Sequence, residues 1–339
     1  MCISDSDFIA AKNIISGAQK IVIISHRGPD GDTVGANLAL RRALKEQWGR
    51  QVISACVDTP PANCDFLPEV SEYVNDFDLN WPDLIIVVDA GAHYMTRFHE
   101  TKPEIFAGKP PVLNIDHHAS NDFFGTVNLV DAEAASATHI IYHFLKRCGF
   151  KIDRQIATCL LNGLYYDTGS FMHSNTSSAV LETASELLWK GADFKTIAKK
   201  QFHTMPVRQL KVYGKILERA RVNSKKIAVS TVTTQDLDEI GASPDDTTGS
   251  IDYLNSIPEG SFCCLLYEDR RGTIKGSFRT RDSNVNLAKL AKVFGGGGHE
   301  KAAGFSFPGH LIDSNSSIKI EDVGQTRPTK KNTHQSEDL

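Results

Sequence analysis

Four short apolar runs constrain the fold of this 339-residue chain more than any other feature. They are residues 21–24 (IVII), 52–57 (VISACV), 84–88 (LIIVV) and 112–115 (VLNI). Short runs without polar alternation are typical of strands that are buried on both faces, as in parallel sheets. Apolar residues at helical spacing lie between or after them, in 35–48, 134–145, 154–164, 179–189 and 207–220. Strands alternating with helices predict an α/β fold with a doubly wound, mostly parallel sheet over residues 1–185.

The pattern changes after residue 185. Residues 186–224 are predicted to be consecutive helices with basic faces, which would form a helical connector. Strands return at 226–232, 261–267 and 273–280, followed by a helix at 285–293, so residues 225–310 are predicted to form a smaller α+β domain. Residues 311–339 are polar, low in aromatic residues and without periodicity, which predicts a disordered tail.

Charge and cysteine content exclude several classes of protein. The chain has 37 Lys and Arg against 41 Asp and Glu, a net charge of -4, which excludes a strongly basic nucleic-acid coat protein but not a local basic patch. No apolar run approaches the roughly 20 residues of a membrane span, and no basic and apolar secretory signal is visible. The seven scattered cysteines form no CxxC pair. They are expected to be reduced thiols in the cytoplasm.

Acidic and imidazole side chains follow three of the predicted strands. The carboxyl ends of strands in an open parallel sheet share one edge, where ligands bind. Three strand ends and one helix end are therefore expected to bring the following residues to one crevice: His26, Asp30, Asp32, Asp89, Asp116, His117, His118 and Asp167.

This combination of side chains suits divalent cations. Carboxylates and imidazoles together are ligands for ions such as Mn²⁺, and two ions roughly 3.5–4 Å apart can assist phosphoryl displacement by metal-bound hydroxide. No thiolate accompanies them, which disfavours a structural zinc site. Taken singly, Asp32 could be a helix N-cap and His26 a hydrogen-bonded core histidine. Asp116 could orient a neighbouring histidine instead of binding a metal.

A second group of polar residues lies in the C-terminal half. In the segment GTIKGSFRTR, Arg279 and Arg281 are expected on one polar, cationic strand face. Arginines at this spacing can grip a phosphate, whereas the alternative is a solvated outer face of a sheet. The segment FGGGGHEKAAGF follows, and its glycines could form an anion-binding nest or a flexible turn.

The motifs HRGPDGD, a strand-terminal Asp, DHH and DTGSF occur in this order and resemble those of the DHH phosphoesterase superfamily. That superfamily includes RecJ-like exonucleases, nanoRNases and family II pyrophosphatases. The resemblance implies a hydrolase with two divalent ions, usually Mn²⁺. It implies that the first ion is held by His26 and Asp30 and the second by Asp32, His117 and Asp167, with Asp89 as the bridge. It places His118 beside the substrate phosphate as a catalytic residue. One departure is Ala90, where many relatives have a hydroxyl residue.

The C-terminal segments SFRTR and GGGGHEKAAGF resemble the substrate-binding domain of DHH nanoRNases and alanyl-tRNA synthetases. The resemblance spans residues 15–307 and implies that the substrate lies between the two domains. It implies a substrate-binding role for Arg279, Arg281, Gly296, Gly297, Gly298 and His299.

The implied function is hydrolysis of short oligoribonucleotides to mononucleotides and dephosphorylation of pAp, the bisphosphorylated adenosine nucleotide. The alternatives are a cyclic- or linear-dinucleotide phosphodiesterase of the same superfamily and a non-catalytic RNA-binding protein on this fold. The expected partners are short RNA oligonucleotides and pAp, without a membrane, and a homodimer is left open.

Overall fold

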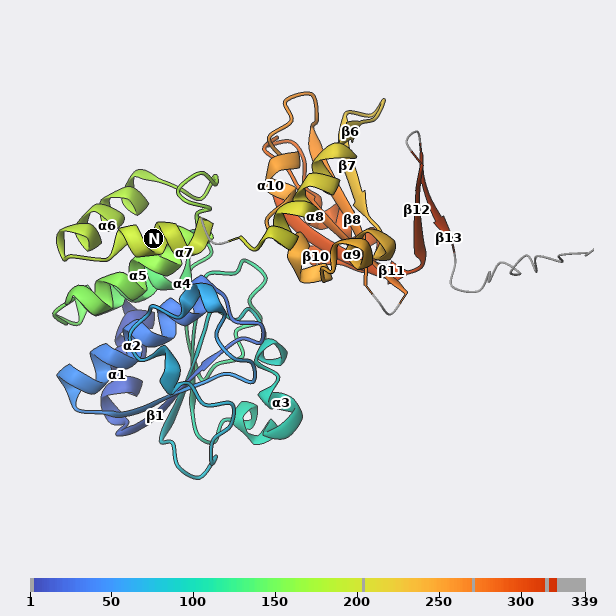
Figure 1. The fold of residues 1–339 in the computed structure, drawn as a ribbon. Coiled ribbons are helices and arrows are strands. Elements are labelled where there is room, and N and C mark those ends of the chain that lie inside the picture. Colours follow the sequence, from blue (N-terminus) through green and yellow to red (C-terminus); the bar gives the residue numbers. More distant parts are fainter. Residues whose placement is uncertain (1–2, 203–204, 270–271, 315–316, 322–339) are drawn as a thin grey trace, which may run out of the picture. The chain divides into compact units, whose positions relative to one another are not determined.

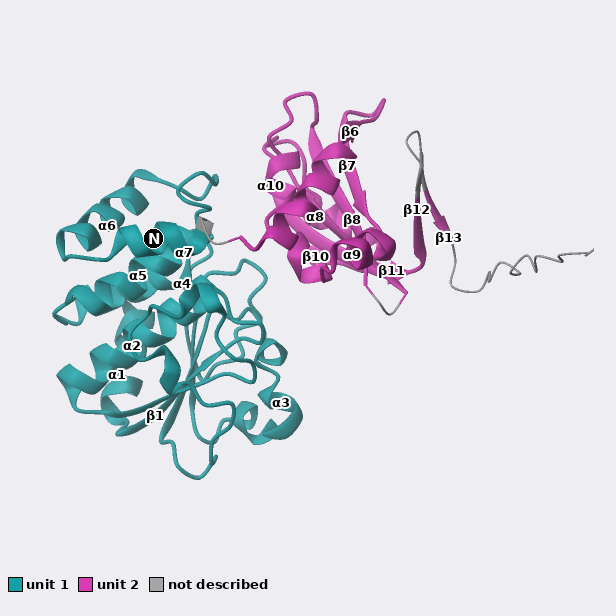
Figure 2. Ribbon diagram, viewed as in Figure 1, with its two compact units in different colours: residues 1–204 teal, residues 205–339 magenta. Residues whose placement is uncertain are grey.

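The computed structural model describes residues 3–202, 205–269, 272–314 and 317–321 (Figure 1). The chain divides into two compact units, Met1–Thr204 and Met205–Leu339 (Figure 2). No helix in these described ranges is long and apolar enough to cross a membrane.

The two helices on either side of this division correct the prediction of a separate connector at 186–224. Helix α7 (Phe194–Phe202) packs on α5 of unit 1, whereas α8 (Val207–Glu218) packs on β7 and α9 of unit 2. Ile197 of α7 and Val212 and Ile216 of α8 are buried in the cores of their own units. Each helix is therefore an integral part of its unit.

Unit 1 contains the parallel sheet that the apolar runs predict. Its five strands have the order β2-β1-β3-β4-β5. They are β1 (Lys20–Ser25), β2 (Gln51–Ala55), β3 (Leu84–Val88), β4 (Val112–Asp116) and β5 (Val127–Val130). Only β5 was not predicted, because its four residues are mostly half-buried and form no continuous apolar run.

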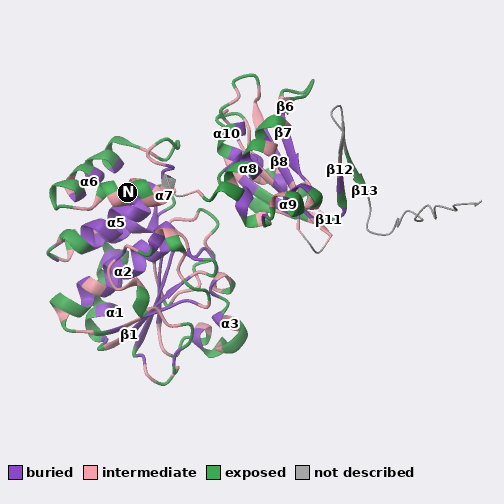
Figure 3. Ribbon diagram, viewed as in Figure 1, coloured by how far each residue is buried: buried purple, intermediate pink, exposed green. Residues whose placement is uncertain are grey.

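Both faces of this sheet are covered, which explains why its strands are almost wholly apolar. Leu84, Ile86 and Val88 of β3 join one core, and Ile85 and Val87 join a second core on the opposite face. Figure 3 shows these central strands as buried. The larger core includes helices α1 (Asp5–Gly17), α2 (Gly31–Trp48), α4 (Ala137–Arg147), α5 (Arg154–Asp167) and α6 (Ser178–Trp189). The smaller core includes the short helix α3 (Phe98–Thr101).

Unit 2 is built on a mixed six-stranded sheet of order β10-β11-β9-β8-β7-β6, in which only β7 and β8 pair in parallel. The strands are β6 (Arg221–Val222), β7 (Ile227–Val232), β8 (Phe262–Glu268), β9 (Thr273–Arg279), β10 (Gly297–Gly298) and β11 (Ala302–Pro308). Besides α8, its helices are α9 (Thr234–Ile240), α10 (Ile251–Leu254) and α11 (Leu287–Val293). The predicted α+β class of this unit is confirmed.

Two strands correct the prediction of a disordered tail at 311–339. β12 (His310–Ser314) and β13 (Ser317–Glu321) pair in an antiparallel ladder. Leu311 is buried in a core of unit 2, and its backbone N–H donates to a carboxylate oxygen of Glu268. A short strand pair anchored by one apolar side chain leaves little periodicity to detect. Residues 322–339 of the predicted tail lie outside the described residues.

The close packing of α2 on α5 yields a stability prediction. A Cβ atom at Gly35 would overlap the Cys159 carbonyl oxygen, which belongs to helix backbone and cannot rotate away. We expect Gly35→Ala to lower the free energy of unfolding by about 1–3 kcal/mol in urea titrations, the usual cost of overpacking.

Gly17→Ala is the matched control, because a Cβ atom there meets nothing within 4 Å. It should be neutral or slightly stabilising, since alanine restricts the unfolded chain. Equal stability of the two variants would contradict the α2–α5 contact.

Candidate functional site

The predicted ligand residues of unit 1 meet at the carboxyl edge of the parallel sheet. In the order β2-β1-β3-β4-β5, the chain reverses its winding direction between β1 and β3, the place where such sheets bind ligands. His26 follows β1, Asp89 follows β3 and His117 follows β4. Three groups of ligand atoms form there, each with its atoms within 4.8 Å of one another: Asp89, His117 and His118; His26, Asp30 and Asp89; and Asp32, His117 and Asp167.

Asp89 is the centre of this arrangement. Its side chain is 4% exposed, and its two carboxylate oxygens each lie 3.4 Å from a histidine Nε2, Oδ2 from His26 and Oδ1 from His117. Oδ1 is buried without a hydrogen-bond partner among the described residues. The backbone of Asp89 has φ +57°, a left-handed conformation that is costly for a residue with a side chain. Such strain, next to an unsatisfied carboxylate oxygen, is typical of a functional position.

The local fold holds Asp30 and Asp32 in different ways. Oδ1 of Asp30 accepts the backbone N–H groups of Asp32 and Thr33, so Asp30 is the N-cap of α2 and Asp32 is not. Asp32 is fully buried and accepts hydrogen bonds from the backbone of Ala137 and Thr138 at the start of α4. A carboxylate has about four lone-pair sites, so both aspartates retain capacity for a cation.

Asp116 contacts His118, as expected of a residue that orients a neighbouring histidine. Its Oδ1 lies 2.7 Å from Nδ1 of His118, and its Oδ2 accepts a hydrogen bond from the amide of Asn121 at 2.6 Å. Asn121 in turn donates to Asn114 on β4. The amide residues were not singled out in the sequence, because a lone asparagine in a loop carries no pattern.

Burial and repulsion between neighbouring carboxylates shift the pKa values of the carboxyl groups in the site. Burial, with the charges of Asp89 and Asp167, raises the pKa of Asp30 to about 7. Burial also raises the pKa of Asp32. Burial opposes ionisation of Asp89, but the nearby imidazoles of His117 and His26 outweigh that effect and lower its pKa. No lysine or arginine forms an ion pair with these carboxylates within the described ranges.

The neighbouring carboxylates raise the pKa values of the histidines as well. Burial opposes protonation of His26, but the hydrogen bond and charge of Asp89 and the charge of Asp30 raise its pKa to about 10. The pKa of His117 is raised in the same way by Asp167 and Asp89. The raised pKa values of Asp30 and Asp32 show that positive charge is lacking beside these acids. Divalent cations, which bind oxygen and nitrogen ligands, would supply that positive charge. The residues present therefore fit divalent metal ions.

The predicted substrate-binding residues lie in unit 2. Arg279 ends β9 and is half-buried, and Arg281 is exposed just beyond the strand. The predicted alternation along β9 is confirmed, because Ile274, Gly276 and Phe278 are buried. Gly297 and Gly298 form β10, and the exposed His299 follows at its turn.

The glycine run has a structural explanation at two of these positions. A Cβ atom at Gly296 would overlap the carbonyl oxygen of Gly304 and the Phe305 side chain, and one at Gly298 would lie 2.5 Å from the carbonyl oxygen of Ala302. Both glycines therefore allow β10 to approach β11 closely. Gly297 faces open space, so its backbone is free to approach a ligand.

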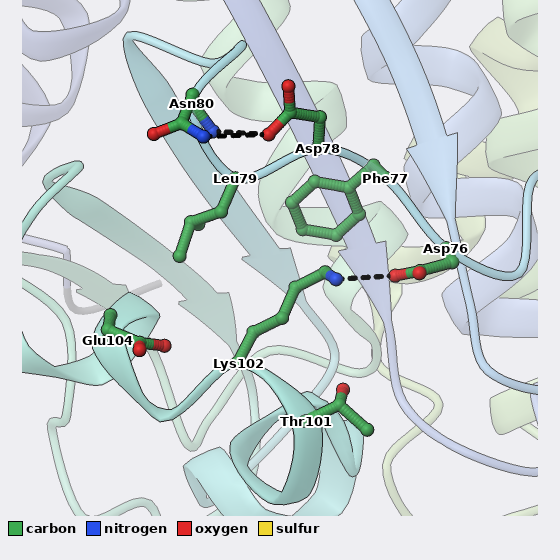
Figure 4. A pocket seen from close by; sticks show the side chains of 8 residues that line it. All are labelled: Asp76, Phe77, Asp78, Leu79, Asn80, Thr101, Lys102 and Glu104. Carbon is green, nitrogen blue, oxygen red and sulfur yellow. Dashed lines mark hydrogen bonds and ion pairs between the residues drawn. The ribbon is translucent and has the colours of Figure 1, made fainter.

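A hollow of about 810 Å³ in unit 1 contains none of the candidate metal ligands (Figure 4). Its one lysine, Lys102, already pairs with Asp76 at 2.7 Å. The remaining charged groups lining it, Asp78 and Glu104, are acidic and would repel a phosphate. The metal centre is therefore the better candidate for chemistry on phosphate esters.

The raised pKa of His26 predicts how stability depends on pH in the metal-free protein. A histidine with a raised folded-state pKa stabilises the fold fully below its ordinary pKa of 6.5, and this stabilisation is lost as pH rises through about 10. The Tm in EDTA should therefore fall between pH 6.5 and 10, as measured by scanning fluorimetry. His26→Gln should flatten this slope, and an unchanged slope in the variant would contradict the assignment.

The two units match two known domain families. Residues 20–164 match the DHH family, N-terminal domain, and residues 224–321 match the DHHA1 domain. The bifunctional oligoribonuclease and PAP phosphatase NrnA of Thermus thermophilus is 31% identical over 299 residues, which cover 86% of each chain. The Bacillus subtilis protein of the same name is 25% identical, over 86% of this chain and 90% of its own.

A solved structure supports the same relationship. The crystal structure of an exopolyphosphatase-related protein from Bacteroides fragilis superposes with a TM-score of 0.82 at 25% identity. The superposition covers 90% of this chain and 92% of the other. The resemblance drawn from the motifs is thus confirmed, and the chain belongs to the DHH family and carries a DHHA1 domain in its C-terminal half.

Proposed function

We propose that this protein hydrolyses short oligoribonucleotides to mononucleotides and dephosphorylates pAp at the metal centre of unit 1. The observation that carries the proposal is the convergence of three groups of ligand atoms on one sheet edge, two of which share Asp89. The names of the two NrnA relatives, which align over most of their own length, support this choice of substrates.

We assign the first ion to His26, Asp30 and Asp89, and the second to Asp32, His117 and Asp167, with Asp89 shared between them. Mn²⁺ is the proposed ion, because this mixture of imidazole and carboxylate suits it. Ions bound there would act as Lewis acids that activate water and neutralise charge on the scissile phosphate.

His118 is the proposed catalytic residue. Burial opposes its protonation, but the hydrogen bond and charge of Asp116 raise its pKa, so the imidazole favours its cationic form. The contact of Asp116 with Nδ1 orients the imidazole ring, and we propose that Nε2 donates a hydrogen bond to a phosphate oxygen of the substrate. A fixed donor of this kind stabilises charge that develops during phosphoryl transfer.

Arg279, Arg281, Gly297 and His299 are proposed to hold the nucleotide, and Gly296 and Gly298 to shape their loop. No feature of the described residues favours a dinucleotide phosphodiesterase over this function. A complete set of ligand residues disfavours a purely RNA-binding role. The six described cysteines are free thiols, which supports a proposed cytoplasmic location.

Asp89→Asn tests the metal centre. Removing one carboxylate charge from the shared ligand should lower kcat/KM at least about 100-fold for both pAp and a trinucleotide with Mn²⁺, because even outer partners of metal ligands are worth 10–100-fold. Asp76→Asn is the matched control, because Asp76 lines the separate hollow of about 810 Å³ and is not a candidate metal ligand. This variant should retain wild-type rates. Full activity of Asp89→Asn, or of the wild type in EDTA, would overturn the proposal.

Arg279→Ala tests the role of unit 2. Loss of a phosphate-binding guanidinium should raise KM about tenfold while kcat changes little, because the arginine binds substrate without touching the reacting atoms. Lys289→Ala, which removes an exposed cation from α11, is the control. The role of Arg279 is ruled out if steady-state kinetics show the same KM for both variants.

A further inference from the structure

A hollow of about 370 Å³ is lined by the residue that follows His26 and by the segment 94–100, which comes a few residues after Asp89. Its walls are Arg27, Tyr94, Met95, Arg97, His99 and Glu100. The backbone N–H of Arg27 donates to the carbonyl of Met95 at 2.8 Å, which ties the loop after β1 to the turn after β3. The hollow is therefore anchored to the candidate metal ligands through the backbone on both sides.

Of the two arginines that line this hollow, Arg97 is paired with a carboxylate and, among the described residues, Arg27 is not. Arg97 is engaged by Glu100 through two hydrogen bonds of 3.0 and 2.8 Å, so the only carboxylate lining the hollow is already neutralised. Asp58 lies near Arg97 and accepts the backbone N–H of Gly28 at 2.7 Å. The guanidinium of Arg27 forms no hydrogen bond or ion pair with any residue in the described ranges, and its charge acts on Glu100 only at longer range.

An aromatic ring stands beside this cation. Tyr94 is 60% exposed, and its ring packs edge-on against His93 at 6.0 Å between centroids. His93 packs in turn against His99 and Phe106, so the exposed ring rests on an aromatic base. An exposed ring with a free guanidinium nearby is the combination that binds single-stranded nucleic acid, by base stacking and phosphate contact.

Two further features distinguish the wall of this hollow. Arg97 has φ +58°, a backbone conformation that glycine adopts at lower cost, so the turn keeps an arginine despite the strain. Nδ1 of His99 is buried without a hydrogen-bond partner in the part of the chain that the structure describes. The free guanidinium of Arg27 on the wall of the hollow suits an anionic ligand.

We propose that this hollow is a subsite for a second nucleotide of the RNA substrate, next to the scissile phosphate. Tyr94 stacks on the base and Arg27 binds the adjoining phosphodiester. The inference rests on the proposed function and refines it, because pAp has a single nucleoside and does not fill this subsite. Arg27 and Tyr94 are thus specificity-determining residues that favour oligonucleotides over pAp.

The test compares two substrates in Arg27→Ala and Tyr94→Ala. The ratio of kcat/KM for triadenylate to kcat/KM for pAp, measured with Mn²⁺, should fall about tenfold in each variant. Tyr94→Phe should keep the wild-type ratio, because the ring and not the hydroxyl stacks. Arg154→Ala and Tyr253→Ala remove exposed side chains of the same kinds elsewhere and should keep it too.

Equilibrium binding provides a second readout without catalysis. A fluorescently labelled triadenylate should bind about tenfold more weakly to Tyr94→Ala than to the wild type in EDTA. The proposed subsite is wrong if Tyr94→Ala binds triadenylate as tightly as the wild type and the kcat/KM ratio is unchanged in the variants. It is also wrong if the variants lose hydrolysis of pAp and of triadenylate to the same extent. Failure of the proposed function is a separate result, in which the wild type hydrolyses neither substrate with Mn²⁺.

Discussion

The feature on which the rest of unit 1 depends is a group of acidic side chains whose ion-pair partners, among the described residues, are histidines. Asp30, Asp32, Asp89 and Asp167 lie close enough for their charges to act on one another, and no lysine or arginine in the described ranges pairs with them. Such an arrangement costs stability unless protons or cations compensate it. The sheet topology brings Asp30 and Asp89 to the same edge, and helices α2 and α5 add Asp32 and Asp167 there. The cost is consistent with a site kept for chemistry and not for folding.

The candidate metal site could be predicted because the positions of its side chains follow from the order of the strands. Once three apolar runs are read as neighbouring parallel strands, the residues after them must share an edge, and His26, Asp89 and His117 do so. The motif comparison then added roles that the topology alone does not supply. The exact capping residue was not predictable, because Asp30 and Asp32 both lie within reach of the first turn of α2 and only backbone geometry separates them.

The errors in the fold come from elements whose stability depends on distant partners. The strand β5 and the pair β12–β13 are short, and their registers are set by β4 and by each other. The helices α7 and α8, predicted as part of a connector, have amphipathic sequences. Such a sequence does not indicate which core its apolar face packs on. The sequence left an anion-binding nest and a turn open for the glycine run, and the contact of Gly296 and Gly298 with β11 could not be located without the fold. Sequence patterns report what a segment prefers locally, and tertiary packing decides these cases.

The central claim is that acids and imidazoles from separate strands jointly hold a pair of ions around Asp89. Anomalous diffraction from crystals grown with Mn²⁺ measures this directly. The account predicts two peaks in each chain, about 4 Å apart, with Asp89 contacting both. A single ion would contradict the account, and so would ions bound only near Asp76 and Glu104 in the hollow of about 810 Å³.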